Sequence, residues 1–344
     1  MAEAKDLLQV LITIKFSEEL LQAIRATSDR IEVLYYPVDE AKRVPEDVWA
    51  RAEVLYTARV APEAGQAPNL RWMHVHSAGV DHILDQSILS EPEITLTTAS
   101  GIHATNMAEY AFAMMLAFGH RLLTMLRYQG ESRWPEEKKF EIFMPLELRG
   151  STVGIVGYGS IGREIARLAK AFGMEVLAVK RNVFEPADRA GYHLPGTGDP
   201  EGTHFDRLYP PEALASMVRE CDFVVVTAPL TQGTRNIFGG EVFAAMKPTA
   251  FLINIGRGGV VDEEALLEAL QKKQIAGAAL DVFEAEPLPE DNPLWKQPNV
   301  IISPHISGNT ADYNDKAADL FIENLERYLA GKALLNVVDL TREY

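Results

Sequence analysis

A short glycine-rich stretch near the middle of the chain constrains the fold more than any other feature. It reads GYGSIG over residues 157–162, between an apolar run at 152–156 and the amphipathic segment "REIARLAKAFG". In a strand-turn-helix unit, the first glycine permits the tight turn, the second lets the backbone approach a pyrophosphate, and the third lets the helix pack against the sheet. The helix N-terminus then presents N–H groups and a partial positive charge. The stretch therefore predicts a dinucleotide-binding unit.

The rest of the chain alternates strand-like and helical segments in the same way. Before residue 101 the apolar runs are "LLQVLITI", "IEVLYY", "EVLYTA", "LRWMHVH" and "ITLTT"; a long helix is expected from Ala104 to about Tyr128, and a second series of runs begins at Ser151. Such alternation predicts an α/β protein with two Rossmann-like or flavodoxin-like domains, doubly wound parallel sheets and an interdomain cleft. Residues 102–308 are expected to form the dinucleotide-binding domain. Periodicity leaves the last helix with either sheet, and we assign 309–344 with 1–101 to the other domain.

Composition narrows the class of protein. The 344 residues carry a net charge of −16 with no basic run, which argues against nucleic-acid binding and requires a local positive pocket for any anionic ligand. No apolar run is long enough to span a membrane, and the N-terminus lacks the basic start and cleavage site of a signal peptide. The single cysteine, Cys221, cannot form an internal disulfide, so we expect a reducing cytoplasm and a buried thiol.

The residues after the second strand of the glycine-loop unit bear on the choice of cofactor. An NAD site usually presents Asp or Glu here to the ribose hydroxyls, whereas "EVLAVK" ends in Lys180 and is followed by Arg181. Both cations could pair with a 2′-phosphate, which favours NADP(H). They could equally be ordinary solvated side chains. The long connection after Glu185 contains Asp188, which keeps NAD(H) possible.

Four chemically capable residues follow later apolar runs. Arg257, Asp281, Glu286 and His305 come at or after the ends of "FLINI", "GAALDV" and "VIISP". Ligands bind at the carboxyl edge of an open α/β sheet, so these side chains could converge there. Each alone could instead be a loop ion pair, a solvated residue or a histidine bonded to backbone.

Together with the glycine loop, these segments resemble the D-isomer-specific 2-hydroxyacid dehydrogenases, a family that includes glyoxylate/hydroxypyruvate reductases. The resemblance covers nearly the whole chain, through "HSAGVDHI", "NMAEYAFAMMLA", "TAPLT", "NIGRGGVVDEEAL", "DVFEAEPLP" and "SPHISG". It implies Arg257, Glu286 and His305 as catalytic residues and the backbone of Ala78 and Gly79 as a site for the substrate carboxylate. The cofactor contacts, implied by the resemblance or by the arguments above, are Gly157, Tyr158, Gly159, Ser160, Ile161, Gly162, Lys180, Arg181, Thr227, Pro229, Ile255, Asp281 and Ser307, with Asp281 near the nicotinamide carboxamide.

The residue types suit reduction of a 2-keto acid independently of the resemblance. The carbonyl oxygen must gain a proton as hydride arrives, and the imidazolium of His305 is well matched to donating it. Glu286 would orient the ring and favour its charged form. Arg257 can bind the carboxylate and polarise the carbonyl. Glyoxylate and hydroxypyruvate are the expected substrates, ahead of bulkier keto acids; His74, His76 and His82 lack a completing carboxylate or cysteine, so no metal is expected.

Several alternatives remain at this level. The same fold could serve a dinucleotide-sensing corepressor, against which all three catalytic residues are retained. Glu286 disfavours a formate dehydrogenase, where the resemblance would give Gln, and the chain ends too soon for a regulatory domain of the phosphoglycerate dehydrogenase kind. The family also implies a homodimer through the nucleotide domains. Domain closure over the substrate, bringing Gly79 toward Arg257 and His305, is expected to exclude water.

Overall fold

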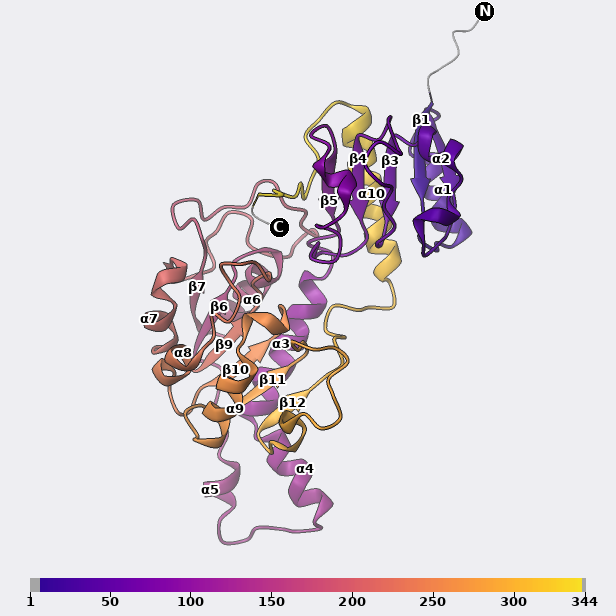
Figure 1. Ribbon diagram of the computed structural model, residues 1–344. Coiled ribbons are helices and arrows are strands. Elements are labelled where there is room, and N and C mark those ends of the chain that lie inside the picture. The colour runs from indigo at the N-terminus through magenta and orange to yellow at the C-terminus, as the bar shows by residue number, and fades with distance from the viewer. Residues whose placement is uncertain (1–6, 342–344) are drawn as a thin grey trace, which may run out of the picture. The chain divides into compact units, whose positions relative to one another are not determined.

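The chain divides into two compact units, each built on its own parallel sheet (Figure 1). The computed structural model describes residues 7–341. The first unit holds the described residues up to Ile102, Ala190–Tyr192, and the described residues from Thr310 onward. The second unit holds His103–Arg189 and His193–Asn309. The predicted α/β class with two parallel sheets is confirmed.

The first unit has five strands in the order β2-β1-β3-β4-β5, all parallel. Its elements are β1 (Leu8–Ile12), α1 (Glu18–Ala26), β2 (Ile31–Tyr35), α2 (Glu46–Arg51), β3 (Val54–Thr57), β4 (Trp72–Val75), β5 (Thr95–Thr98) and α10 (Tyr313–Leu329). All residues of β3 and β4 are buried, as expected for strands covered on both faces.

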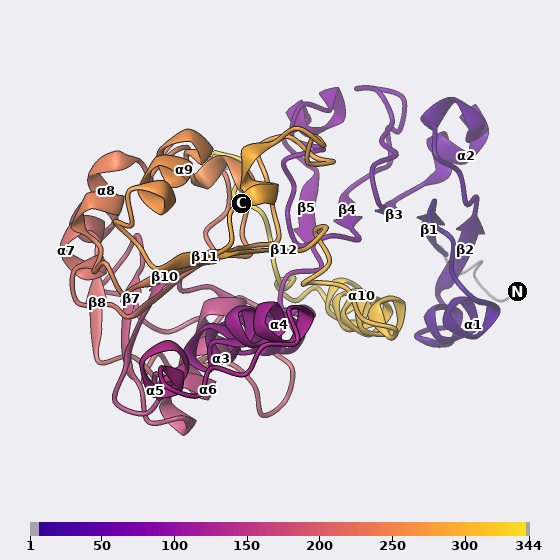
Figure 2. The same ribbon diagram turned by 90° about the horizontal axis from the view of Figure 1, so that it is seen from below.

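The last helix belongs to the first unit, which decides a question that periodicity left open. The ring of Phe321 in α10 stacks on Tyr56 of β3, with centroids 4.5 Å apart, and packs 5.2 Å from Trp72 of β4. Asn324 is fully buried and exchanges hydrogen bonds with the backbone of Leu335, at 2.8 and 3.2 Å. In Figure 2, α10 lies beside α1. The aromatic side chains thus select the sheet that the helix covers.

The second unit has seven parallel strands in the order β12-β11-β10-β9-β6-β7-β8. Its strands are β6 (Thr152–Val156), β7 (Glu175–Val179), β8 (Arg207–Tyr209), β9 (Phe223–Val226), β10 (Phe251–Asn254), β11 (Gly277–Leu280) and β12 (Val300–Ile302). Its helices are α3 (Ala104–Gly119), α4 (Leu122–Gly130), α5 (Lys139–Phe143), α6 (Ser160–Ala171), α7 (Leu214–Val218), α8 (Gly240–Ala245) and α9 (Glu263–Gln271). After β6, the chain adds β7 and β8 on one side of this strand and then β9 to β12 on the other. Where the strand order reverses in this way, ligands bind at the carboxyl ends of the strands.

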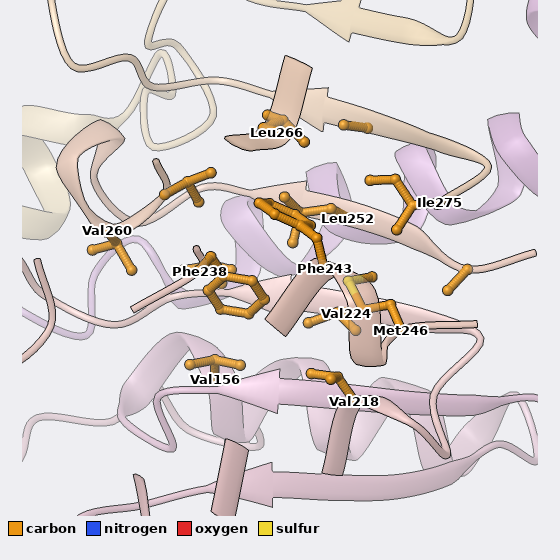
Figure 3. Packing of buried hydrophobic residues seen from close by; sticks show 14 of the residues in the cluster. Val156, Val218, Val224, Phe238, Phe243, Met246, Leu252, Val260, Leu266 and Ile275 are labelled. Carbon is orange, nitrogen blue, oxygen red and sulfur yellow. The ribbon is translucent and has the colours of Figure 1, made fainter. Parts of the chain in front are cut away.

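Helices cover both faces of this sheet. Figure 2 shows α7, α8 and α9 on one side and α3 and α6 on the other. Figure 3 shows the first of these layers, where Phe238 and Phe243, both fully buried, lie over the strand residues Val224 and Leu252. Burial of such aromatic side chains supplies much of the driving force for assembling the layers.

Two sequence predictions need correction. The single helix expected from Ala104 to about Tyr128 is wrong: α3 ends at Gly119, and Arg121 takes a left-handed conformation (φ 57°) before α4 begins. A left-handed residue ends a helix readily because the reversed chain donates N–H groups to the last helical carbonyls, as Arg121 N does to Phe118 O at 3.1 Å. The long connection after Glu185 contains a strand, β8, too short to stand out from its Gly- and Pro-rich surroundings.

Two histidines lie in or directly after a strand of the first unit: His74 is buried in β4, and His76 is partly buried just beyond the end of that strand. The ring of His74 is fully buried; its Nδ1 lies 2.8 Å from the Thr97 hydroxyl, and its Nε2 has no partner among the described residues. The same hydroxyl accepts a hydrogen bond from Trp72 Nε1 at 2.7 Å, so its own proton is available to Nδ1. Burial lowers the pKa of His74 to about 3, with a smaller contribution from His76, and burial lowers the pKa of His76 to about 4.

These histidines should make the protein acid-labile. In the unfolded chain both take up a proton below their ordinary pKa of 6.5, whereas the folded state keeps them neutral until the pH approaches 3 to 4. The unfolded state therefore binds more protons, and lowering the pH from 7 to 5 should cost about 2 kcal/mol of unfolding free energy per histidine. Urea unfolding at both pH values measures the loss. His74→Leu should reduce it by about half and the exposed control His120→Asn should not; equal losses in all three proteins would contradict the argument.

Candidate active site

The glycine loop lies between β6 and α6, at the point where the winding reverses. Gly157 has φ 108°, and a Cβ there would lie 2.8 Å from Ala228 N. A Cβ on Gly162 would lie 2.2 Å from the Gly157 carbonyl oxygen, so α6 packs directly on the loop. A Cβ on Gly159 would meet no protein atom within 4 Å. Packing therefore demands the first and third glycines, while the second is suited to the approach of an external group such as a pyrophosphate.

The neighbouring strand ends complete this edge of the sheet. Thr227, after β9, donates a hydrogen bond from Oγ1 to the Gly157 carbonyl at 2.7 Å. The Pro229 carbonyl accepts one from Thr234 Oγ1 at 2.6 Å, and Ile255 N, after β10, donates to Val226 O at 3.1 Å. These segments form one continuous edge beside the glycine loop. The N-terminus of α6 directs its free N–H groups to the same place, which suits the binding of a diphosphate.

His305 and Glu286 form a hydrogen-bonded pair. The distance from His305 Nδ1 to Glu286 Oε2 is 2.7 Å, and the other carboxylate oxygen, Oε1, accepts from Phe283 N at 3.0 Å. Half of the His305 side chain is exposed, so the ring is held on one side and open on another. Since Nδ1 is engaged by the carboxylate, Nε2 is the nitrogen suited to exchange a proton with a ligand.

The loop that carries His305 is held by a network that the sequence did not reveal. His305 has φ 50°, a left-handed conformation that non-glycine residues rarely adopt. Asp281, fully buried after β11, accepts hydrogen bonds from Ile306 N and Ser307 N, each at 2.9 Å, and from Ser303 Oγ at 2.5 Å. Its backbone oxygen accepts from His305 N at 2.9 Å. These bonds lower the pKa of Asp281 against the opposing effect of burial, so it holds the loop as a carboxylate.

Two residues on one face of α3 form hydrogen bonds with the same loop. Asn106 Nδ2 donates to the backbone oxygens of Ser307 and Asn309, at 2.5 and 3.0 Å, and Tyr110 lies 2.6 Å from Ser303 Oγ. The spacing of Asn106 and Tyr110 puts both on one side of the helix. That polar pair within an apolar helix is the signal that could have identified them as positioning residues.

Arg257 follows β10 and is partly buried. One of its guanidinium nitrogens, Nη1, donates to the Gly256 carbonyl at 2.9 Å. A Cβ on the next residue, Gly258, would lie 1.9 Å from the carbonyl carbon of Phe283. The loop with Arg257 and the segment leading to Glu286 thus touch backbone to backbone. Arg257 follows β10, and Glu286 and His305 follow β11 and β12, so all three lie beyond the carboxyl ends of neighbouring parallel strands.

The two cations proposed for a 2′-phosphate lie just beyond β7. Arg181 is exposed, whereas the Lys180 ammonium donates a hydrogen bond to the Glu185 carbonyl. Burial and the nearby Arg163 lower the pKa of Lys180. In the first unit, Ala78 and Gly79 occupy a partly exposed turn after β4, where Ser77 Oγ donates to the Gly79 carbonyl at 2.8 Å.

The remaining candidates have structural partners. His76 Nδ1 lies 2.8 Å from the Tyr56 hydroxyl, and His82 Nε2 lies 2.8 Å from the Ala58 carbonyl oxygen. Cys221 is fully buried, as predicted, and burial raises the pKa of its thiol to about 12. Within residues 7–341, no helix combines the length and apolar character needed to cross a membrane.

Comparison with known proteins agrees with this architecture. Residues 112–307 match the model of the NAD binding domain of D-isomer specific 2-hydroxyacid dehydrogenases. A glyoxylate reductase from Korarchaeum cryptofilum is 35% identical over 276 residues, 79% of this chain and 77% of the relative.

Two solved structures extend the likeness over nearly all of the chain. A D-isomer specific 2-hydroxyacid dehydrogenase from Xanthobacter autotrophicus Py2, in complex with NADPH and MES, gives a TM-score of 0.78 at 28% identity over 98% of this chain and 99% of its own. An NADPH-dependent glyoxylate/hydroxypyruvate reductase from Sinorhizobium meliloti, in complex with NADP and sulfate, gives 0.75 at 26% identity with the same coverage. The resemblance inferred from the motifs is confirmed, and the chain belongs to the D-isomer specific 2-hydroxyacid dehydrogenases, a family of NAD(P)-dependent oxidoreductases.

Proposed function

We propose that this protein reduces a small 2-keto acid, glyoxylate or hydroxypyruvate, to the D-2-hydroxy acid with NADP(H) as the preferred cofactor and NAD(H) as an alternative. The His305–Glu286 pair, 2.7 Å apart at the same sheet edge as the glycine loop, carries this proposal. The names of the relatives support the substrate class, and the NADPH and NADP complexes of the two solved relatives support the cofactor. A corepressor role would not require this pair to be intact.

The catalytic roles follow from the chemistry of each group. When bound, the reduced nicotinamide supplies a hydride to the keto carbon. His305 donates a proton from Nε2 to the carbonyl oxygen and takes it back in the oxidative direction. Glu286 holds the ring through Nδ1 and stabilises its charged form. Arg257 binds the substrate carboxylate and draws electron density from the carbonyl, which stabilises the developing oxyanion.

The other proposed contacts divide between the two parts of the chain. Residues 1–101 and 309–344 form the substrate-binding domain, with the carboxylate received by the backbone of Ala78 and Gly79. Residues 102–308 form the dinucleotide-binding domain. The pyrophosphate lies on the glycine loop, and Asp281 lies near the nicotinamide carboxamide. Further contacts to the cofactor come from Thr227, Pro229, Ile255 and Ser307, all at the carboxyl edge of the sheet, and from Lys180 and Arg181 beyond β7.

A homodimer through the dinucleotide domains is part of the proposal. The α4–α5 segment exposes several large apolar side chains, which we call the apolar arm: Leu122, Met125, Leu126, Trp134, Phe140 and Met144. Figure 1 shows α4 and α5 extending beyond the sheet of the second unit. Several large exposed apolar side chains in one segment are typical of a subunit interface. We also propose, from the single cysteine, that the protein is located in a reducing cytoplasm.

The catalytic assignment predicts the effect of removing the acid. His305→Asn should lower kcat/KM for glyoxylate reduction by about a hundredfold to ten-thousandfold, the usual contribution of a general acid, while the affinity for NADPH stays unchanged. The initial rate of NADPH oxidation and calorimetric cofactor binding measure the two quantities. His120→Asn in the same unit is the control. Activity retained in His305→Asn would reject the mechanism, and no turnover of glyoxylate, hydroxypyruvate or bulkier keto acids would reject the function.

The cofactor assignment predicts that a substitution just after β7 will affect turnover with NADPH and turnover with NADH differently. Arg181→Ala should lower kcat/KM with NADPH by about tenfold to a hundredfold, the contribution of a charge-assisted hydrogen bond, and leave NADH turnover nearly unchanged. Arg219→Ala, at the exposed C-terminal end of α7, is a matched control because a helix that connects parallel strands ends at the opposite edge of the sheet. An equal loss with both cofactors would show that Arg181 does not contact the 2′-phosphate.

The apolar arm predicts the effect of charge on assembly. Leu126 and Phe140 are 53% and 68% exposed, so their replacement by aspartate should not disturb the core of the subunit. The double variant Leu126→Asp/Phe140→Asp should halve the mass measured by light scattering, because a buried carboxylate without a partner opposes association. Phe184→Asp, an exposed apolar side chain outside the arm, should keep the mass of the wild type. A monomeric wild-type protein would overturn the homodimer.

A further inference from the structure

The β7–β8 connection, residues 180–206, is built onto the dinucleotide-binding unit, apart from Ala190–Tyr192, which belong to the first unit. Its principal anchor is Arg163 in the first turn of α6, whose side chain is 1% exposed. Two guanidinium nitrogens donate to the backbone oxygens of Asp199 and Pro186, at 2.5 and 2.6 Å. A buried guanidinium requires such partners, so the course of the connection is set by α6.

A second anchor ties the connection to the glycine loop itself. Tyr158, the second residue of the loop, donates from its hydroxyl to Asp199 Oδ2 at 2.6 Å. The same carboxylate accepts from Thr203 N and His204 N, at 2.8 and 2.9 Å, and is buried. The guanidinium of Arg163 lies 4.7 Å from the centre of the Tyr158 ring. The phosphate loop and the connection therefore form one packed structure.

The packing of the connection places the carboxylate of Asp188 near Arg163 and His193. Asp188 Oδ2 lies 3.9 Å from Arg163 Nε and 3.6 Å from His193 Nε2, and its backbone N–H donates to Pro200 O at 2.8 Å. Lys180 is held at the Glu185 carbonyl, three residues before Asp188. Burial and repulsion by Arg163 lower the pKa of Lys180, while the carboxylates of Asp188 and Glu185 oppose this shift. About a quarter of the Asp188 side chain is exposed.

The place of this carboxylate matters because of what binds beyond the second strand of such a sheet. The ribose of a dinucleotide lies there; a carboxylate accepts hydrogen bonds from its hydroxyls and repels a 2′-phosphate, whereas cations attract the phosphate. Here both are present, the cations at the end of β7 and Asp188 on the connection. We infer that Asp188 is a specificity-determining residue, which weakens binding of the 2′-phosphate and allows NAD(H) to be used beside NADP(H). This inference rests on the proposed function for the identity of the ligand.

The experiment removes this charge and compares the two cofactors. Asp188→Asn should raise the ratio of kcat/KM with NADPH to that with NADH by about tenfold, because one negative charge beside the phosphate is lost. Asp206→Asn is the matched control: Asp206 lies on the same connection and accepts from Val176 N near the start of β7, toward the opposite edge of the sheet, so the ratio should stay unchanged. Tyr158→Phe removes the hydrogen bond to Asp199 without altering charge, so it should weaken the binding of both cofactors equally.

Calorimetric binding of 2′,5′-ADP and 5′-AMP keeps this test independent of turnover. If no keto acid is reduced, the proposed function fails, while a tenfold gain for 2′,5′-ADP over 5′-AMP in Asp188→Asn still supports the inference. An unchanged or lowered ratio in Asp188→Asn overturns it. So does an equal loss for both ligands together with a lowered melting temperature, since Asp188 would then act only by compensating Arg163. Failure of the wild-type protein to bind either nucleotide would overturn both the inference and the proposed cofactor.

Discussion

Close contact between backbone segments at the carboxyl edge of the second sheet is the constraint on which the rest of the site depends. A side chain at Gly162 would overlap the glycine loop, and one at Gly258 would overlap the segment that leads to Glu286. Only with these side chains absent can α6 approach β6 and the Arg257 loop approach the His305–Glu286 pair. These backbone contacts therefore determine the shape of the site, and the shape positions the reactive side chains.

A second consequence concerns charge. The chain carries a net charge of −16, yet both proposed ligands are anions. The positive groups that could receive them are local: the N-terminus of α6, Arg257, and the cations beyond β7. The carboxylate of Asp188 stands beside Arg163 in the first turn of α6, and the Glu185 carbonyl stands beside Lys180, so the field of both cations is limited. Binding of an anion thus depends on these local groups, since the net negative charge of the chain opposes it.

Backbone conformation at His305 illustrates how the scaffold supports chemistry. A left-handed histidine costs free energy and persists only where its surroundings determine it. Asp281, just after β11, fixes this conformation by its hydrogen bonds to the loop, and Asn106 and Tyr110 on α3 hold the same loop. The proposed acid is consequently held by groups that need not touch the substrate at all. Rigid support of this kind is what keeps a reacting group aligned between turnovers.

Local patterns in the sequence determined much of this protein. The apolar runs predicted the parallel strands, GYGSIG predicted the turn into α6, and the order of the motifs predicted the family, because each signal depends on neighbours along the chain. Tertiary structure alone decided the rest: that α10 covers the first sheet through Phe321 and Asn324, that a helix break follows Gly119, and that Asp188 returns to Arg163. Those outcomes depend on contacts between residues far apart in sequence, whose energies no local pattern contains.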